Sequence, residues 1–436
     1  MPWRMLFGIS LIIAVAGAGG YAYWSSTKEA NIAGAEASYQ TLEEKDDVYV
    51  RFVMEAYDII EKQYWQKATD EQLAELFTLS INKAAATTTP PASDRASTAR
   101  LAASVLAGAK DDAAKRELAV GTVQVAVYNL APAGRSQVLT LQQQQQVKET
   151  VANVNPNSNL YSELGVSPSS TPQEIKEAYA QKKTELEASS SPEAMKELER
   201  TKYVNEVLSD PANKQRYDST KAEPTVFSRV FGTTMYLNLL KMSPETAGDF
   251  HKALDEASTT PLSTMIIDMR GNIGGSLEQV PNILGPFFGN NAYLFDLYHQ
   301  GDFTVIRSAA GKDAALDRFH EIAVLTDSQT QSSAEVLAAA LKRFHLATVV
   351  GAKTRGWGTV EGTYPMETEI DPSTKYALML VYGLTLRDDN QPIDGVGVDP
   401  DISMQATGWE NKLPAYFDSA SLISAIRRTA SQPPLK

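Results

Sequence analysis

A serine at the start of a helix-like run is the first residue of the chain that could carry out covalent chemistry. Ser332 is followed three residues later by Glu335, at the start of an apolar helical pattern. A serine hydroxyl is a weak nucleophile that needs a neighbouring base, and an acyl-transfer intermediate needs donors aimed at its oxyanion. The positive end of a helix favours the developing negative charge, so this position suits a nucleophile. The same spacing is a capping box, and capping alone would also explain the serine.

A glycine-rich turn could supply the oxyanion donors. Gly271-Asn272-Ile273-Gly274-Gly275 follows directly on an apolar, strand-like run. The backbone N–H groups of such a turn can face a bound carbonyl, because glycine places no side chain between them. The alternative interpretation is an ordinary glycine turn that joins a strand to a helix.

Four motifs in one order resemble those of the C-terminal-processing (tail-specific) serine peptidases. The resemblance implies that Ser332 is the nucleophile, that Gly274 and Gly275 contribute to the oxyanion hole, and that no cofactor is needed. It also implies a ClpP/crotonase-type α/β core and an extended polypeptide, in particular a C-terminal tail, as substrate or ligand. The base lysine of the family falls at Trp357, and Glu361 replaces the glutamine that orients this lysine. The motifs are Ile266-Ile267-Asp268-Met269-Arg270-Gly271-Asn272-Ile273-Gly274-Gly275, Thr330-Gln331-Ser332-Ser333-Ala334-Glu335, Thr354-Arg355-Gly356-Trp357-Gly358-Thr359-Val360-Glu361 and Gly395-Val396-Gly397-Val398-Asp399-Pro400-Asp401.

Trp357 cannot act as the base, because the indole nitrogen only donates hydrogen bonds. It could bind substrate beside Glu361 by stacking on a peptide side chain, or it could simply pack in the core or at the rim. Lys353, four residues earlier, is a candidate substitute base or, alternatively, a solvated surface lysine. His345 lies about three helical turns from Ser332, roughly 20 Å away, and cannot reach it. The sequence therefore leaves two functions open, a serine-type peptidase and a catalytically silent scaffold or adaptor that binds peptides.

The elements that would position these residues follow an α/β pattern from about residue 223. Strands are predicted at residues 235–240, 265–269, 304–306, 322–325, 348–350 and 376–386. Helices are predicted at residues 244–257, 277–288 and 332–344. We therefore assign residues 223–436 to the peptidase-like domain.

The segment before this domain begins with two amphipathic helices. Val53, Tyr57, Ile60 and Tyr64 recur at helical spacing, and Thr69-Asp70-Glu71-Gln72 is typical of a second helix start. This predicts a helical hairpin over residues 45–83. Residues 84–99, rich in Ala, Thr and Pro, are typical of a flexible linker, and residues 101–154 give only a weak signal, which includes an Ala-rich helical pattern. We predict a linker and a segment of unassigned structure over residues 84–154.

Residues 155–220 resemble a J-domain over nearly their whole length. The resemblance rests on residues 160–168, a helix start at Thr171-Pro172-Gln173-Glu174, and the closing segments at residues 204–211 and 215–218. J-domains stimulate a heat-shock ATPase chaperone through a His-Pro-Asp tripeptide, but Glu187-Ala188-Ser189 stands in the aligned place. We therefore expect an all-helical spacer or docking module, without a chaperone partner, where the peptidase family carries a PDZ domain.

Composition excludes several classes of function. The formal net charge of −13 and the pI near 5.0 argue against nucleic acid as a partner. The chain has no cysteine, so disulfides, thiolate metal sites and a cysteine nucleophile are ruled out. The four histidines share no metal-ligand spacing, and we expect no metal site.

An uncharged apolar segment near the N-terminus is long enough to span a bilayer as a helix. It covers residues 5–24, follows Arg4, and ends in Tyr21, Tyr23 and Trp24, which suit a membrane interface. A cleaved signal peptide is the alternative, since Ala16-Gly17-Ala18 fits a cleavage site. We predict a transmembrane anchor or signal segment at residues 1–25, with the bulk of the chain outside the cytoplasm in the cell envelope.

Overall fold

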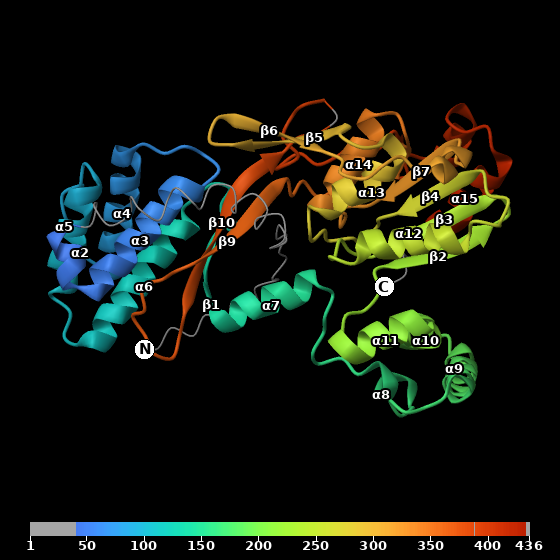
Figure 1. Ribbon diagram of the computed structural model, residues 1–436, viewed down its shortest axis with the longest axis horizontal. Coiled ribbons are helices and arrows are strands. Elements are labelled where there is room, and N and C mark those ends of the chain that lie inside the picture. Colours follow the sequence, from blue (N-terminus) through green and yellow to red (C-terminus); the bar gives the residue numbers. More distant parts are fainter. Residues whose placement is uncertain (1–40, 388, 433–436) are drawn as a thin grey trace.

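The computed structural model describes residues 41–387 and 389–432. It comprises a helical bundle, a small helical module and an α/β core, with a second sheet between the core and the bundle (Figure 1). Within these residues, no helix combines the length and the apolar character needed to cross a bilayer. The predicted anchor or signal segment at residues 1–25 lies outside the described residues.

A six-stranded sheet forms the centre of the α/β core. Its strand order is β11-β8-β7-β4-β3-β2, and all neighbours are parallel except the antiparallel pair of β2 and β3. Strands β3, β4, β7 and β8 confirm predicted strands, whereas β2 and β11 were not predicted. The strands are β2 (Val226–Phe231), β3 (Thr234–Leu239), β4 (Thr264–Asp268), β7 (Glu321–Thr326), β8 (Thr348–Gly351) and β11 (Ile402–Ser403).

Helices cover both faces of this sheet and give the core three layers. Leu237 and Ile267 point to the face covered by α12, α13 and α14, whereas Tyr236 and Ile266 point to the face covered by α15. Successive strand residues face opposite sides, so each strand contributes to both apolar cores. The helices α12 to α14 confirm the three predicted helices. Their bounds are α12 (Thr246–Glu256), α13 (Gln279–Phe288), α14 (Ser333–Arg343) and α15 (Ala420–Ala430), with short 3-10 helices at Ala314–Arg318 and Trp409–Ala415.

A second sheet joins the core to the bundle. β9 and β10 form a long antiparallel hairpin that runs between the two parts, and β1 and β5 also pair with β10 (Figure 1). Leu378 and Leu380 of β10 are buried in the apolar core of the bundle. The core and the bundle therefore share a sheet and cannot fold as fully separate units. The strands are β1 (Gln137–Thr140), β5 (Tyr293–His299), β6 (Asp302–Arg307), β9 (Thr359–Pro365) and β10 (Tyr376–Thr385).

The bundle is larger than the predicted hairpin. Two further helices, α5 and α6, pack on α3 and α4 around Tyr57, Phe77 and Val123. The predicted linker is too long, because α5 begins at Arg95, and the residues left unassigned form most of α5, then α6, β1 and α7. The many alanines give these helices little contrast between an apolar and a polar face, so their sequence pattern is weak. Their small side chains instead allow close contacts between helices, such as that of Gly121 with Ala84. The bundle helices are α2 (Leu42–Asp46), α3 (Val48–Gln63), α4 (Asp70–Ala85), α5 (Arg95–Leu106) and α6 (Asp112–Tyr128), and α7 (Leu141–Val151) packs on β1 and β10 instead.

The small module is entirely helical, in agreement with its sequence pattern. Thr171 caps α9 and forms a capping box with Glu174, and Asp210 caps α11. Tyr161 and Tyr217 are buried in its apolar core. Glu187-Ala188-Ser189 spans the end of α9 and the start of the loop to α10. The helices are α8 (Leu160–Leu164), α9 (Pro172–Glu187), α10 (Pro192–Ser209) and α11 (Pro211–Thr220).

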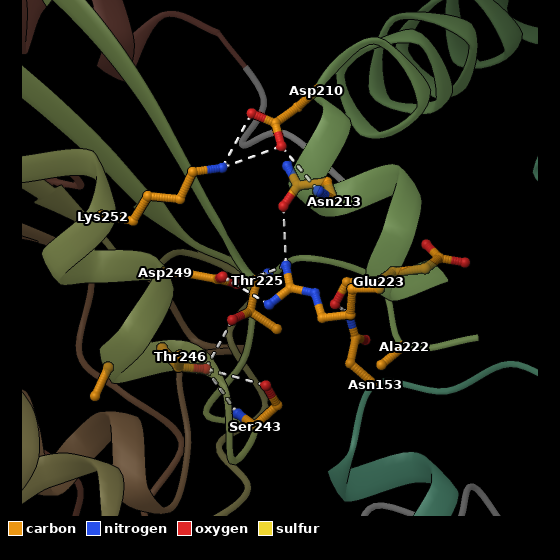
Figure 2. A network of polar contacts seen from close by, with 12 residues as sticks. Asn153, Asp210, Asn213, Ala222, Glu223, Thr225, Ser243, Thr246, Asp249 and Lys252 are labelled. Atoms are coloured by element: carbon orange, nitrogen blue, oxygen red, sulfur yellow. Dashed lines mark hydrogen bonds and ion pairs between the residues drawn. The ribbon is translucent and has the colours of Figure 1, made fainter. Parts of the chain in front are cut away.

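Ion pairs between α11 and α12 fix this module to the α/β core (Figure 2). Arg216 Nη1 lies 2.7 Å from Asp249 Oδ1, and both side chains are largely buried. Asp249 also accepts a hydrogen bond from the Thr225 N–H at 3.1 Å. Lys252 donates to both carboxylate oxygens of Asp210 at 3.0 Å. These charge-assisted contacts give the module one defined orientation on α12.

The chain enters and leaves the module through adjacent residues. Val154 and Ala222 form an antiparallel bridge. Next to it, the Glu223 N–H donates to the Asn153 carbonyl at 3.1 Å, and the Asn153 side chain donates back to the Glu223 carbonyl at 3.0 Å. Asn153, Ala222 and Glu223 lie together below the ion pairs (Figure 2). The module is thus an insertion whose two ends meet.

Breaking the buried ion pair should destabilise the chain more than breaking the exposed one. We expect Arg216→Met to cost about 2 kcal/mol, because Asp249 then keeps a buried charge without the two N–H donors of Arg216. Lys252→Met is the matched control, since its pair with Asp210 is about one-third exposed on each side and should contribute under about 1 kcal/mol. Urea-induced unfolding measures both variants, and equal losses would contradict this account of the interface.

Candidate active site

Ser332 adopts a strained backbone conformation at the start of α14. Its φ and ψ are 58° and −130°, a region that residues other than glycine rarely adopt. Such strain costs about 1–3 kcal/mol and persists only where surrounding contacts impose it. Thr171, an ordinary cap, has a relaxed φ of −69° and ψ of 158°. Capping alone therefore does not explain the conformation of Ser332.

The glycine turn lies directly against Ser332. A Cβ on Gly274 would lie 2.7 Å from the Ser332 Cβ, and a Cβ on Gly275 would lie 2.1 Å from the Met242 carbonyl oxygen. Both glycines also have positive φ, of 81° and 142°. Only glycine permits this close approach. The structure thus brings together the serine and the turn that the sequence singled out.

Asn272 holds the turn and engages one of its N–H groups. Its side chain accepts a hydrogen bond from the Gly274 N–H at 2.8 Å and donates to the Leu239 carbonyl at 2.8 Å. The Gly274 N–H is therefore already engaged, which corrects the oxyanion role predicted for it. The N–H groups of Gly275 and Ser333 donate to no residue that the structure describes. These two groups are the candidate oxyanion donors, and Gly274 contributes by its small size.

Glu335 connects the nucleophile position to the loop that carries Trp357. One carboxylate oxygen accepts from the N–H groups of Ser332 at 2.9 Å and Trp357 at 2.7 Å. The other accepts from the Gly356 N–H at 2.8 Å and from the Thr354 hydroxyl. The side chain is fully buried, and burial raises the pKa of Glu335 although these four donors oppose the rise. Glu335 therefore positions both segments of the site.

Trp357 occupies the place that the resemblance gives to the base lysine. Its indole Nε1–H donates to Glu361 Oε1 at 3.1 Å. The Arg135 guanidinium stacks on the ring, with Cζ 3.4 Å from the ring centroid, and a cation on an aromatic face is stabilising. Arg135 covers one face of the ring, so a substrate side chain could stack only on the other.

Glu361 is a fully buried carboxylate with one unpartnered oxygen. Oε1 accepts from Trp357 and from the Thr359 hydroxyl at 2.5 Å, whereas Oε2 has no partner among the described residues. Burial raises the pKa of Glu361 to about 8, although the two donors and the Arg135 charge oppose the rise. Arg135 pairs with Asp394 at 3.1 Å, and burial also raises the pKa of Asp394. Burial therefore favours the protonated form of Glu361, and its Oε1 is already engaged by two donors.

Lys353 has a different environment from the one expected of a substitute base. Its Nζ lies 3.1 Å from Asp399 Oδ1, and both side chains are about half exposed, at 50% and 53%. A base must lie within hydrogen-bond reach of the hydroxyl that it deprotonates. No hydrogen bond joins Lys353 to Ser332 in the part of the chain that the structure describes. These contacts favour the surface-lysine interpretation.

The space beside Ser332 is narrow. A pocket of about 10 Å³ lies there, lined by Gly275, Ser333, Thr359 and Thr385 among others. A volume of this size holds about one water molecule. A large substrate side chain could enter only if β9 or the glycine turn moved.

Sequence reasoning did not find Arg135, Asp394 or the role of Glu335 in the site. Glu335 carried a usable signal, since it lies three residues after Ser332 and had been interpreted only as a helix cap. Arg135 lies in the segment between α6 and β1, where no motif marked it. It reaches Trp357 because β1 pairs with β10, next to β9.

Comparison with known families assigns two parts of the chain. Residues 233–404 match Peptidase family S41. The chain contains a peptidase family S41 domain. Residues 159–218 match the DnaJ domain, so both resemblances are confirmed. The S41 domain includes Ser332, the glycine turn and Trp357, whereas Arg135 lies outside it.

The curated relatives of the S41 domain are similar over part of their length. The carboxy-terminal processing protease CtpB of Bacillus subtilis is 31% identical over 188 residues, which are 43% of this chain and 36% of the relative. The carboxy-terminal-processing protease of Bartonella bacilliformis is 27% identical over 181 residues, 41% of this chain and 40% of the relative. This chain thus spans two fifths or less of these relatives. The solved photosystem II D1 C-terminal processing protease has a TM-score of 0.49 and 13% identity, covering 84% of this chain and 94% of that chain.

The raised pKa of Glu361 predicts how stability depends on pH. Because the folded chain favours the protonated carboxyl, this contribution is complete below the ordinary pKa of 4.5 and is lost as the pH rises toward 8. Relative to Glu361→Gln, the free energy of unfolding of the wild-type chain should fall by up to about 1.4 kcal/mol per pH unit across that window. Urea-induced unfolding at several pH values measures the difference. A difference between the wild-type chain and Glu361→Gln that does not change with pH would contradict the raised pKa of Glu361.

Proposed function

We propose that the protein binds extended polypeptide segments, in particular C-terminal tails, at the S41 site around Ser332 and does not cleave them. Trp357 carries this proposal, because its Nε1–H donates to Glu361 where a proton acceptor for the Ser332 hydroxyl is needed. The printed names of the relatives, carboxy-terminal processing proteases, support tails as the ligand class.

Unpartnered polar groups next to Ser332 support a peptide-binding role. Both side-chain amide atoms of Gln331 and the Ser333 hydroxyl are buried without a hydrogen-bond partner among the described residues. Buried polar groups are normally satisfied, so groups of this kind favour a polar ligand. The free N–H groups of Gly275 and Ser333 would donate to a peptide carbonyl.

Hydrolysis is the second candidate function, and the strain at Ser332 favours it. In that case the Ser332 hydroxyl attacks the peptide carbonyl and the N–H groups of Gly275 and Ser333 stabilise the oxyanion. The serine proton would have to pass to a residue other than Trp357. Lys353 and the unpartnered Oε2 of Glu361 are the groups to test by substitution.

Binding and cleavage of an unfolded protein distinguish these candidates. We would incubate the purified full chain and its Ser332→Ala variant with reduced, unfolded casein and measure both bound and cleaved substrate. The proposal predicts that both proteins bind and that neither cleaves. Cleavage that is lost in Ser332→Ala would establish a serine peptidase instead, and failure of both proteins to bind would overturn the proposal.

We also propose that residues 5–24 attach the protein to a membrane, with the bulk of the chain outside the cytoplasm in the cell envelope. The uncharged length and the aromatic end of this segment support it. The full chain should resist carbonate extraction from membranes, whereas a chain that begins at residue 27 should not. Recovery of the full chain in the soluble fraction would contradict anchoring.

For the J-like module we propose a spacer or docking role. The absence of His-Pro-Asp at Glu187-Ala188-Ser189 supports this role. Stimulation of a heat-shock chaperone's ATPase by the full chain, lost on deletion of residues 155–220, would contradict it.

A further inference from the structure

A groove of about 1440 Å³ lies between α7, the helical module and the loop that follows β3. Glu149 lines it from α7, Glu163 and Arg200 line it from the module, and Lys241 lines it from the core. All three parts of the chain thus contribute to one polar groove.

Lys241 is a cation in this groove without a carboxylate partner. Its side chain is half-buried, and its ammonium donates to the Thr150 carbonyl at the end of α7. No carboxylate of the described residues lies within ion-pair distance of it. Arg200, the other cation of the groove, is paired with Glu163 at 2.6 Å and with Glu223 at 3.6 Å. Burial lowers the pKa of Lys241 to about 8, so an anionic ligand would stabilise its charged form.

Much of the remaining lining consists of side-chain amides. An amide both donates and accepts hydrogen bonds, so it can pair with either backbone group of a polypeptide whatever its sequence. Such a lining suits an extended chain better than a small charged molecule. The amides belong to Gln142, Gln145, Gln146, Asn153, Asn155 and Asn157.

Lys241 is one residue away from the backbone that supports the glycine turn. Met242 forms a parallel bridge with Gly275, and its N–H donates to the Gly274 carbonyl at 3.1 Å. Gly274 in turn lies against Ser332. A short series of backbone contacts thus connects Lys241 to Ser332, from Met242 to Gly275 and from Gly274 to Ser332.

We propose that Lys241 binds the terminal carboxylate of a polypeptide tail whose preceding residues lie along this groove and lead to Ser332. The inference rests on the proposed function and assigns the place where the end of the tail is held. A competing explanation is that Lys241 only adds a positive charge at the C-terminus of α7, where the Thr150 carbonyl also accepts from the Asn153 N–H at 3.2 Å. The two explanations differ in whether binding depends on a free carboxylate.

Binding of a peptide and its C-terminal amide tests the proposal. The full chain with Ser332→Ala, which prevents cleavage, would be titrated with a fluorescein-labelled unstructured peptide in both forms, and anisotropy would give each Kd. We expect the amide to bind at least about tenfold more weakly than the free acid. Lys241→Met should weaken binding of the free acid by the same factor and leave the amide unchanged, whereas Lys241→Arg should retain most of the preference. Lys176→Met, an exposed lysine on α9 outside the groove, is the matched control.

The outcomes separate this inference from the proposed function. Equal affinity for the two peptides, or an equal loss for both in Lys241→Met, would overturn the carboxylate site while peptide binding stands. Binding of neither peptide would overturn the proposed function as well. A Lys241→Met chain that is destabilised but keeps the preference for the free acid would establish the helix-end role instead.

Discussion

The double substitution Trp357→Lys with Glu361→Gln should turn this chain into a peptidase. We expect cleavage of an unfolded protein at least about 100-fold above the wild-type rate, because a positioned base contributes about 100- to 10,000-fold. The strained Ser332 and the free N–H groups of Gly275 and Ser333 already supply the other parts of the chemistry. Initial rates of casein cleavage measure the gain.

Both substitutions are needed, because an ionised Glu361 would keep the lysine introduced at position 357 in its protonated form. A carboxylate beside an ammonium raises the pKa of the ammonium, and a protonated lysine cannot accept the serine proton. A glutamine at position 361 has nearly the same shape as the glutamate and still forms hydrogen bonds, but it carries no charge. The guanidinium of Arg135, which now stacks on Trp357, would lower the pKa of the new lysine and favour its neutral form. Trp357→Lys alone should therefore gain much less.

Two controls show whether any gain in cleavage comes from the new base or only from the space left by the indole ring. Trp357→Leu with Glu361→Gln removes the ring without adding a base and should not cleave. Ser332→Ala in the double variant should abolish the gain. A correctly folded double variant without activity would show that more than the base separates this site from an active peptidase.

Removing Glu335 should cause the largest loss of stability in the S41 domain. Its carboxylate accepts from the N–H groups of Ser332, Gly356 and Trp357 and from the Thr354 hydroxyl, and the side chain is fully buried. Glu335→Ala leaves these donors unpaired, at about 1–3 kcal/mol each and without full additivity, so we expect about 4 kcal/mol overall. Glu335→Gln should cost roughly half of that, because one amide group can satisfy only part of the set.

Glu174 provides a matched control, because it occupies the same position in a capping box at the start of α9. Its carboxylate accepts only from Thr171 and is exposed. Glu174→Ala should therefore destabilise the chain much less than Glu335→Ala in urea-induced unfolding. Similar losses would mean that Glu335 acts only as a helix cap.

Local periodicity was enough to predict four of the six strands of the core sheet and the helices α12 to α14. The apolar runs at residues 265–269 and 322–325 and the helix that follows Ser332 each carry their own pattern, so β4, β7 and α14 were expected where they occur. The close approach of Ser332 to the glycine turn was also foreseeable, because both follow the carboxyl ends of neighbouring parallel strands.

Contacts between distant segments could not be predicted in this way. β9 begins with Thr359 and Val360 but buries the acidic residue Glu361, so its strand pattern was hidden by a residue type that rarely lies in a core. Arg135 reaches Trp357 through the pairing of β1 with β10, which no local pattern encodes. The burial of Glu361 and the contact of Arg135 with Trp357 both depend on polar groups that meet only in the folded chain.

The meeting of Val154 and Ala222 at one bridge has a consequence for how such a chain can arise. A segment whose ends touch can be added, removed or exchanged in a single genetic event without moving the strands on either side. The host would need only a short turn to close the gap. The J-like module can therefore be exchanged as one unit, and the ion pairs of Arg216 and Lys252 with their partners are the contacts that a replacement would have to supply again.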